Sequence, residues 1–232
     1  MKRLVILSAL LLPALASHAA LNLEGQSGVF LNTLAYAAPP STTEFSNHQV
    51  NLDSLGAVST YNLSTGLRGN IELGFTKVAS SVPGVSDQNV LLAKWQFGQE
   101  TPTSPALAFW AIQRDLTDGA SSTDYGLSAT KILKPGGKPL VLDLGLRSTK
   151  ALGLGLFGLS GDRKVKWEGS AALFVAPKFA IATEFKQQIS ADTWTDVAFR
   201  YVASDQLNLD AGIADLGPGL GNQIAIAVTW KQ

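Results

Sequence analysis

Large apolar residues alternate with small or polar residues through much of this chain. The final segment, residues 224–230, places two isoleucines, a valine and Trp230 on one side and small residues or threonine on the other. The same two-residue period runs through residues 71–76, 140–147, 179–186, 195–201 and 207–213. Successive side chains of a strand point to opposite faces, so each run predicts a strand with one apolar face. The predicted fold class is therefore all-β.

With weaker candidates included, the pattern predicts an antiparallel sheet of about 12 strands, within a range of roughly 10–14. The first candidate strand is the least regular. If the sheet closes into a barrel, residues 21–36 could instead lie inside or beside that barrel. The candidate strands cover residues 28–36, 48–61, 70–78, 89–97, 105–114, 123–133, 139–148, 164–175, 178–187, 194–203, 206–214 and 223–230.

The N-terminus has the pattern of a secretory signal peptide. A positive tip, Met1–Arg3, precedes an apolar stretch, Leu4–Leu15, and small residues follow at Ser17–Ala19. This pattern predicts cleavage after Ala19 and export through the Sec pathway. Residues 20–232 would then form a single domain.

Composition narrows the function classes. Removal of Lys2 and Arg3 leaves 16 basic and 18 acidic residues, a net charge of −2, which lacks the basic excess of nucleic-acid-binding proteins. The sequence has no cysteine, and His48 is the one histidine left after cleavage. Disulfides and thiol chemistry are excluded, and a metal site is disfavoured.

Two all-β classes fit an exported protein of this kind: a transmembrane barrel and a soluble secreted sandwich. Charged residues make up 16% of the sequence, below the average of about 25% for soluble proteins. The second face of the strands is crowded with Gly, Ala and Ser and carries sparse charges of both signs. A narrow lumen requires small residues and paired charges. The sequence therefore favours a transmembrane β-barrel in the outer membrane of a Gram-negative cell.

Links and aromatic residues fit such a barrel. The turns at residues 176–177 and 203–205 are short, whereas the links at 149–163, 188–193 and 216–222 are longer, which predicts short periplasmic turns and longer external loops. Trp230 resembles a C-terminal insertion signal, although Lys231 and Gln232 follow it. Candidates for aromatic girdles at the membrane interfaces are Tyr36, Tyr61, Trp95, Trp110, Trp167, Trp194, Tyr201 and Trp230.

Several stretches resemble a domain-of-unknown-function family of proteobacterial outer-membrane barrel proteins. They are residues 125–131, an Arg-x-Thr-Lys-Ala stretch at 147–151, a Gly-rich loop ending at Asp162, and residues 23–25 and 211–217. The sequence departs from the family pattern at Leu152, where Asn is usual, and at Ser160, where Gly is usual. The resemblance implies a barrel fold and an outer-membrane location but no established activity.

Two motifs suggest chemistry, and neither is well supported. Gly153, Gly155 and Gly158 match G-x-G-x-x-G, but the residues that follow are poor helix starters, so a flexible or inward-folded loop is favoured over nucleotide binding. Ser46 and His48, ahead of Asp53, could share one strand face as a hydrolase pair. A lone histidine of this kind is more often an ordinary polar residue.

The sequence thus predicts a non-enzymatic, porin-like channel for small polar solutes, without cofactor or nucleic-acid partner. Predicted partners are outer-membrane lipid, lipopolysaccharide and the barrel-assembly machinery. The alternatives are a non-conducting structural or interaction barrel that uses its external loops and, more remotely, a secreted soluble β-sandwich or barrel hydrolase. Residues 149–163 could gate the pore. The predicted lumen and constriction residues are Glu72, Asp143, Arg147, Lys150, Asp162, Arg163, Glu184, Lys186, Asp196, Arg200 and Asp210.

Overall fold

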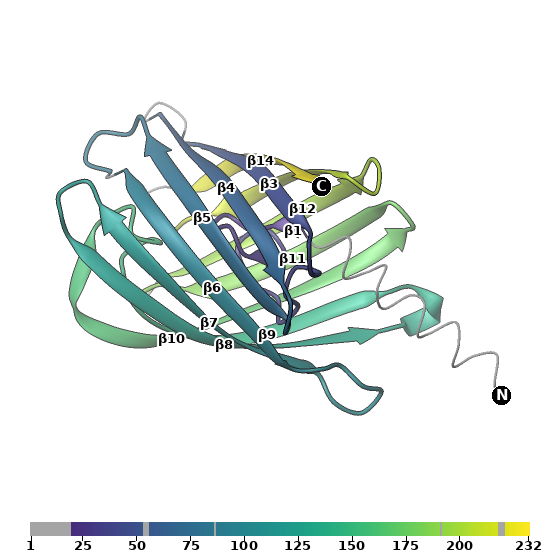
Figure 1. Ribbon diagram of the computed structural model, residues 1–232. Helices are drawn as coiled ribbons and strands as arrows, with labels where there is room; N and C mark the ends of the chain where they lie inside the picture. The colour runs from purple at the N-terminus through teal and green to yellow at the C-terminus, as the bar shows by residue number, and fades with distance from the viewer. Residues whose placement is uncertain (1–19, 53–55, 86, 191, 218–220) are drawn as a thin grey trace.

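A computed structural model of the protein describes residues 20–52, 56–85, 87–190, 192–217 and 221–232. The predicted signal peptide, residues 1–19, lies outside this range. The described residues form a closed barrel of 12 antiparallel strands (Figure 1), which confirms the predicted fold class. The barrel strands are β3 (Thr43–Asn51), β4 (Ala57–Leu67), β5 (Ile71–Ser80), β6 (Gln88–Gly98), β7 (Ala106–Leu116), β8 (Ser121–Leu133), β9 (Leu140–Ala151), β10 (Leu159–Ala176), β11 (Phe179–Gln187), β12 (Thr193–Val202), β13 (Leu207–Asp215) and β14 (Asn222–Lys231).

Each strand pairs with its neighbours in sequence, and the barrel closes where β14 pairs with β3. Two further strands of two residues each, β1 (Ala20–Leu21) and β2 (Ser27–Gly28), pair with each other inside the ring of strands. The described residues contain one short 3-10 helix, Pro135–Gly137, in the link between β8 and β9. Within the described residues, no helix combines the length and apolar character that a membrane crossing requires.

The two faces of the strands differ as their alternation predicts. On β14, Ile226 is 53% exposed on the outer surface, whereas its neighbours Ala225 and Ala227 are buried on the inner surface. The other strands repeat this arrangement, so large apolar side chains cover the outside of the barrel. Such an apolar exterior is what a lipid-facing barrel wall requires.

Two strand predictions were wrong although the predicted number of strands was right. Residues 28–36 are not a barrel strand: they lie inside the barrel, the alternative that their weak pattern left open. Residues 48–61 are not one strand but include the end of β3, the start of β4 and, between them, residues 53–55 outside the described range. The backbone N–H of Leu52 donates to the carbonyl of Gly56 at 2.8 Å, and Gly56 adopts a positive φ of 124°, which favours glycine.

The predicted girdle and loop pattern also needs correction. Trp110 and Trp194 point inward and are buried, and Tyr36 lies inside the barrel, so these three are not lipid-facing. The other five predicted aromatics are exposed on the outside. The link between β6 and β7, residues 99–105, is as long as the link between β9 and β10, residues 152–158. Short turns are therefore not the rule at the end of the barrel that carries the C-terminus.

Trp110 explains why a glycine stands opposite it. Gly126 on β8 pairs with Trp110 on β7, and a Cβ at residue 126 would overlap the indole ring. We expect Gly126→Ala to lower the free energy of unfolding by about 1–3 kcal/mol, because an overpacked interior forces side chains to move. Urea titration of the refolded barrel measures this change. Gly161→Ala is the matched control, because a Cβ there meets open space; an equal effect of both variants would contradict the argument.

Candidate functional site

The interior of the barrel is lined with charged side chains. They come from inward positions of eleven of the twelve strands, and most of them are buried. Within the described strands, the inward carboxylates are Glu44, Glu72, Asp124, Asp143, Glu168, Glu184, Asp196 and Asp210, and the inward cations are Lys94, Arg114, Arg147, Lys166, Lys186, Arg200 and Lys231.

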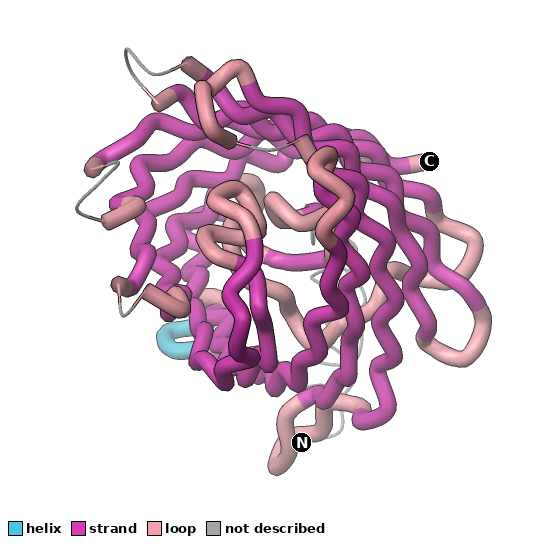
Figure 2. The backbone as a smooth tube through the Cα atoms, turned by 90° about the vertical axis from the view of Figure 1, so that its left-hand side faces the viewer, coloured by secondary structure: helices cyan, strands magenta, loops and turns pink. Residues whose placement is uncertain are grey.

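Residues 20–38, which we call the luminal segment, occupy this interior. Figure 2 shows the backbone of this segment passing through the inside of the ring of strands. Every residue from 20 to 35 is buried, although β1 and β2 account for few of them. A buried stretch without regular structure needs partners for its backbone groups. The barrel wall supplies many of those partners.

Glu24 of the luminal segment lies in a buried ion cluster. Its carboxylate accepts hydrogen bonds from both terminal nitrogens of Arg147, at 2.8 and 3.0 Å, and from Lys186 Nζ at 2.9 Å. Arg114 pairs with the same carboxylate. Burial alone would raise the pKa of Glu24, but these three cations hold that pKa well below its ordinary value. Glu24 is therefore charged and bound to β7, β9 and β11 at once.

Two wall carboxylates complete the cluster. Asp124 accepts from Arg147 Nη2 at 2.6 Å and from Arg114 Nε at 3.3 Å, and Glu168 lies 3.2 Å from Lys186 Nζ. With Glu24, the cluster contains three carboxylates and three cations, so its charges balance. Loss of one member of such a cluster leaves a buried charge unpaired, which is strongly destabilising.

Glu72 on β5 binds two distant points of the luminal segment. Its carboxylate accepts from the backbone N–H and the hydroxyl of Ser27, at 2.8 and 2.7 Å, and from the backbone N–H of Ala38 at 2.9 Å. Lys94 on β6 lies 3.0 Å from the same carboxylate and donates to the carbonyls of Ser27 and Leu34. Glu72 and Lys94 thus bind both donors and acceptors of the luminal segment.

Glu184 on β11 binds a turn of the luminal segment. Its carboxylate accepts three consecutive backbone N–H groups, those of Phe30 at 2.7 Å, Leu31 at 3.0 Å and Asn32 at 2.8 Å. Consecutive N–H groups that converge in this way form an anion-binding concavity. Asn32 in turn donates its side-chain amide to the carbonyl of Gly169 on β10 at 2.7 Å. The turn is therefore held by two neighbouring strands.

The loop between β9 and β10, residues 152–158, folds inward as one of the two sequence alternatives predicted. Leu154 and Leu156 are buried with residues of the luminal segment, and Arg114 donates to the carbonyl of Leu154 at 3.1 Å. Gly158 is followed directly by strand β10 and not by a helix. The glycine motif therefore lacks the helix N-terminus that dinucleotide binding requires.

Little free space remains between the luminal segment and the wall. The cavities found there measure about 40, 20 and 20 Å³. A single water molecule needs roughly 10–15 Å³ of such space. In this structure the interior is therefore occluded.

Eleven residues were predicted to line the lumen or its constriction, and the structure brings eight of them together inside the barrel. These eight are Glu72, Asp143, Arg147, Glu184, Lys186, Asp196, Arg200 and Asp210. All eight stand at the inward positions that the alternation of their strands predicts.

Lys150, Asp162 and Arg163 were also predicted to line the interior, and they do not. Strand β10 begins at Leu159 and not near residue 164, so Asp162 and Arg163 stand on an extended hairpin at the rim. Arg163 lies over the ring of Tyr125 on the outer surface and donates to the carbonyl of Ser148 at 2.8 Å. The side chain of Lys150 follows the outward parity of β9.

Sequence reasoning did not place seven of the interior charges on the inner face. Six of them occupy the inward parity of their strands, where a count of alternate positions finds them: Glu44, Lys94, Arg114, Asp124, Lys166 and Lys231. Glu24 has no such marker, because its cluster partners lie at least 90 residues away in sequence.

The Ser46–His48 pair is an interior feature and not a rim site. His48 Nε2 and Ser46 Oγ are 3.1 Å apart, and both residues are buried. Asn62 donates to Ser46 Oγ at 2.8 Å, and Phe30 of the luminal segment packs beside the imidazole at 5.5 Å. Asp53 lies outside the described residues. Among the described residues, no group of three or more potential ligands is placed to hold a metal ion.

An apolar exterior, a charged interior and a closed antiparallel sheet define a porin-like β-barrel. Residues 112–226 match the family described as "Protein of unknown function (DUF3034)". The match confirms the predicted resemblance and includes residues 125–131, 147–162 and 211–217, but not residues 23–25. No sequence among the curated proteins matches this one.

Solved structures with the same fold are porins and outer-membrane proteins. A KdgM porin in complex with disordered oligogalacturonate has a TM-score of 0.60 and 11% identity, covering 82% of this chain and 98% of that chain. Omp33 of Acinetobacter baumannii has a TM-score of 0.53 and 10% identity, covering 82% and 98%. The NanC porin has a TM-score of 0.52 and 10% identity, covering 81% and 97%. At these identities the likeness concerns the fold alone.

Proposed function

We propose that residues 20–232 form a porin-like channel in a Gram-negative outer membrane, closed by its own luminal segment. The observation that carries this proposal is the binding of that segment to the wall through Glu24, Glu72 and Glu184. Export through the Sec pathway, insertion by the barrel-assembly machinery, and contact with lipid and lipopolysaccharide are part of the proposal. Release of the segment opens a passage for small polar solutes.

The character of the contacts supports a closed channel over a permanently filled barrel. The luminal segment is attached at several points by ion pairs and hydrogen bonds to charged wall residues. Water can replace such contacts, and a wall of charged groups remains wet once the segment has left. The residues that we propose to line the open passage are Glu72, Asp143, Arg147, Glu184, Lys186, Asp196, Arg200 and Asp210.

Deletion of residues 20–38 tests the proposal. In planar bilayers, we expect the refolded mature protein to be closed for most of the time and the deletion variant to show frequent, discrete conductance steps. Heat-modifiable migration on gels serves as the check that both proteins are folded barrels. Two silent, fully folded barrels would overturn the channel proposal, whereas two equally conducting barrels would show that the luminal segment is not the gate.

The wall charges predict the selectivity of the open barrel. Eight inward carboxylates face seven inward cations in the described strands, so the wall alone carries a small excess of negative charge. We expect the deletion variant to prefer potassium over chloride, measured as a reversal potential in a salt gradient. Adding Arg147→Glu should increase this preference. Arg163→Glu is the matched control and should leave it unchanged, because Arg163 lies on the outside.

The second candidate function is a non-conducting structural or interaction barrel. The buried ion cluster around Glu24 favours this second candidate, because a cluster that stays intact keeps the luminal segment inside the barrel. The bilayer experiment separates the two candidates. A hydrolase is less well supported, because His48 and Ser46 are buried beneath the luminal segment, where a substrate has no approach.

A further inference from the structure

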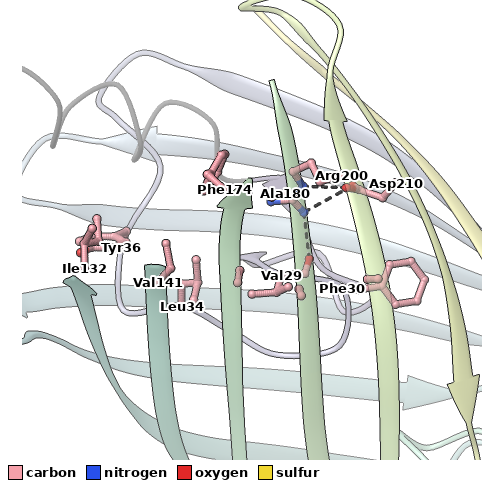
Figure 3. A pocket seen from close by; sticks show the side chains of 13 residues that line it. Val29, Phe30, Leu34, Tyr36, Ile132, Val141, Phe174, Ala180, Arg200 and Asp210 are labelled. Carbon is pink, nitrogen blue, oxygen red and sulfur yellow. Dashed lines mark hydrogen bonds and ion pairs between the residues drawn. The ribbon is translucent and has the colours of Figure 1, made fainter. Parts of the chain in front are cut away.

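Several cations of the barrel wall carry their own counter-charge on a neighbouring strand. Three cations of the described wall each pair with a carboxylate of the wall itself: Lys94 with Glu72, Arg200 with Asp210 and Lys231 with Glu44. Arg200 donates to Asp210 at 2.7 Å and contacts the luminal segment through the backbone carbonyls of Gly28 and Val29 (Figure 3). Such a pair stays neutral whether or not the luminal segment is present.

The cluster around Glu24 is different, because its charge balance depends on the luminal segment. The wall contributes three cations but only two carboxylates to this cluster: Arg114, Arg147 and Lys186 against Asp124 and Glu168. Glu24 supplies the third negative charge. Without Glu24, this part of the wall carries one net positive charge, and a single monoanionic group balances it.

The contacts of Glu24 have the geometry of a carboxylate-binding site. The two terminal nitrogens of Arg147 donate to different oxygens of Glu24, at 2.8 and 3.0 Å, and Lys186 Nζ donates to one of these oxygens at 2.9 Å. A planar guanidinium matches a planar carboxylate in this two-pronged way. Asp124 and Glu168 share these cations and repel a second negative charge, so the site favours a carboxylate over a phosphate dianion.

The site can hold more of a ligand than the single carboxylate of Glu24. Arg147 Nε is buried and makes no hydrogen bond to any described residue. A cavity of about 10 Å³, the space of one water molecule, lies beside Arg147 and Lys186 where strands β9 and β11 end. Lys166, directly opposite Arg147 on β10, adds a half-buried cation on the same inner face.

We propose that this cluster binds the carboxylate of an anionic solute in the open passage, and that Glu24 takes the same position in the closed barrel. The inference rests on the proposed function, because a whole solute reaches the cluster only after the luminal segment has left. The excess of wall carboxylates lies outside the cluster, at Asp143, Glu184 and Asp196, and does not cancel its local positive charge. Glu24 is therefore a tethered competitor of the solute.

The test supplies a free carboxylate to refolded Glu24→Ala. Propionate reproduces the side chain that this variant lacks, and propionamide is its uncharged counterpart. With ionic strength held constant by sodium chloride, we expect propionate to raise the urea midpoint of Glu24→Ala in a saturable manner. Propionamide should cause no shift, and neither should propionate with the wild-type protein, whose site Glu24 fills. If Glu24→Ala does not refold alone, the yield of heat-modifiable barrel becomes the readout, which propionate but not propionamide should restore.

Arg147→Gln, added to Glu24→Ala, should raise the propionate concentration needed for half of the effect at least tenfold. A hydrogen bond to a charged group corresponds to roughly tenfold or more in affinity. This double variant keeps two cations and two carboxylates, so its folding does not depend on an added anion. Arg163→Gln is the matched control in the Glu24→Ala background, because Arg163 lies on the outer surface, and it should leave the propionate effect unchanged.

Absence of a propionate effect, or an equal effect with and without Arg147, would overturn the proposal. An equal shift with ethanesulfonate, a tetrahedral monoanion, would overturn the assignment to a carboxylate. None of these readouts uses conductance, so failure here is distinct from failure of the channel proposal.

Discussion

Replacing Glu24 with glutamine is expected to lower the free energy of unfolding of the refolded barrel by about 3–5 kcal/mol. The variant keeps the shape of the side chain but removes the carboxylate that binds Arg114, Arg147 and Lys186. Removal of one partner from a buried ion cluster typically has an effect of this size, because the remaining charges stay buried without compensation. Urea titration followed by tryptophan fluorescence measures the change.

Asp162→Asn is the matched control for Glu24→Gln. Asp162 also pairs with a cation, Lys164, but the pair is 3.8 Å apart and exposed at the rim. Exposed pairs contribute roughly 0–1 kcal/mol. A loss in Glu24→Gln no larger than that in Asp162→Asn would show that the ion cluster does not hold the luminal segment.

A double variant resolves which partner carries the effect. We expect the effects of Glu24→Gln and Arg147→Gln to be non-additive, with a coupling energy of about 0.5–3 kcal/mol, because the two groups share two hydrogen bonds. Glu24→Gln should also raise the frequency of conductance steps in bilayers. Destabilisation without any change in conductance would support the non-conducting barrel.

The strands were largely predictable because their alternation is local. A residue on a barrel strand needs only its neighbours two positions away to define its face, and β11, predicted at residues 178–187, runs from Phe179 to Gln187. The exceptions have local causes too. The residues before Tyr36 alternate weakly, as an edge strand might, but lie inside the barrel. The end of β3 at Asn51 was overlooked within a longer polar stretch, so the prediction merged β3 and β4.

Only those residues of the candidate site that belong to the barrel strands could be predicted from the sequence. The inward parity of a strand places Glu72 or Lys186 in the interior without knowledge of the rest of the fold. The occupant of the interior is different, because Glu24 is joined to residues on three distant strands. Nothing in the spacing of residues 20–38 encodes those partners. The closure of the barrel is therefore a property of its tertiary structure.

Glu184→Gln is expected to lower the free energy of unfolding by about 2–4 kcal/mol. A hydrogen bond to a charged group contributes about 1.5–3 kcal/mol, and a buried donor left without an acceptor costs about 1–3 kcal/mol. A glutamine can offer only one oxygen to the N–H groups of Phe30, Leu31 and Asn32, and its amide group opposes one of them. Relief of repulsion with Asp196, directly opposite on β12, offsets roughly 0.2–1 kcal/mol.

Asp196→Asn is the matched partner of Glu184→Gln, because it removes the other carboxylate of the same cross-strand pair. In the part of the protein that the structure describes, no N–H group of the luminal segment donates to Asp196. We therefore expect Asp196→Asn to leave stability unchanged or to raise it by up to about 1 kcal/mol. If urea titration shows that Glu184→Gln lowers the free energy of unfolding whereas Asp196→Asn raises it, the attachment of the luminal segment depends on Glu184. A loss of equal size in both variants would contradict that assignment, because the two carboxylates would then act as one structural unit.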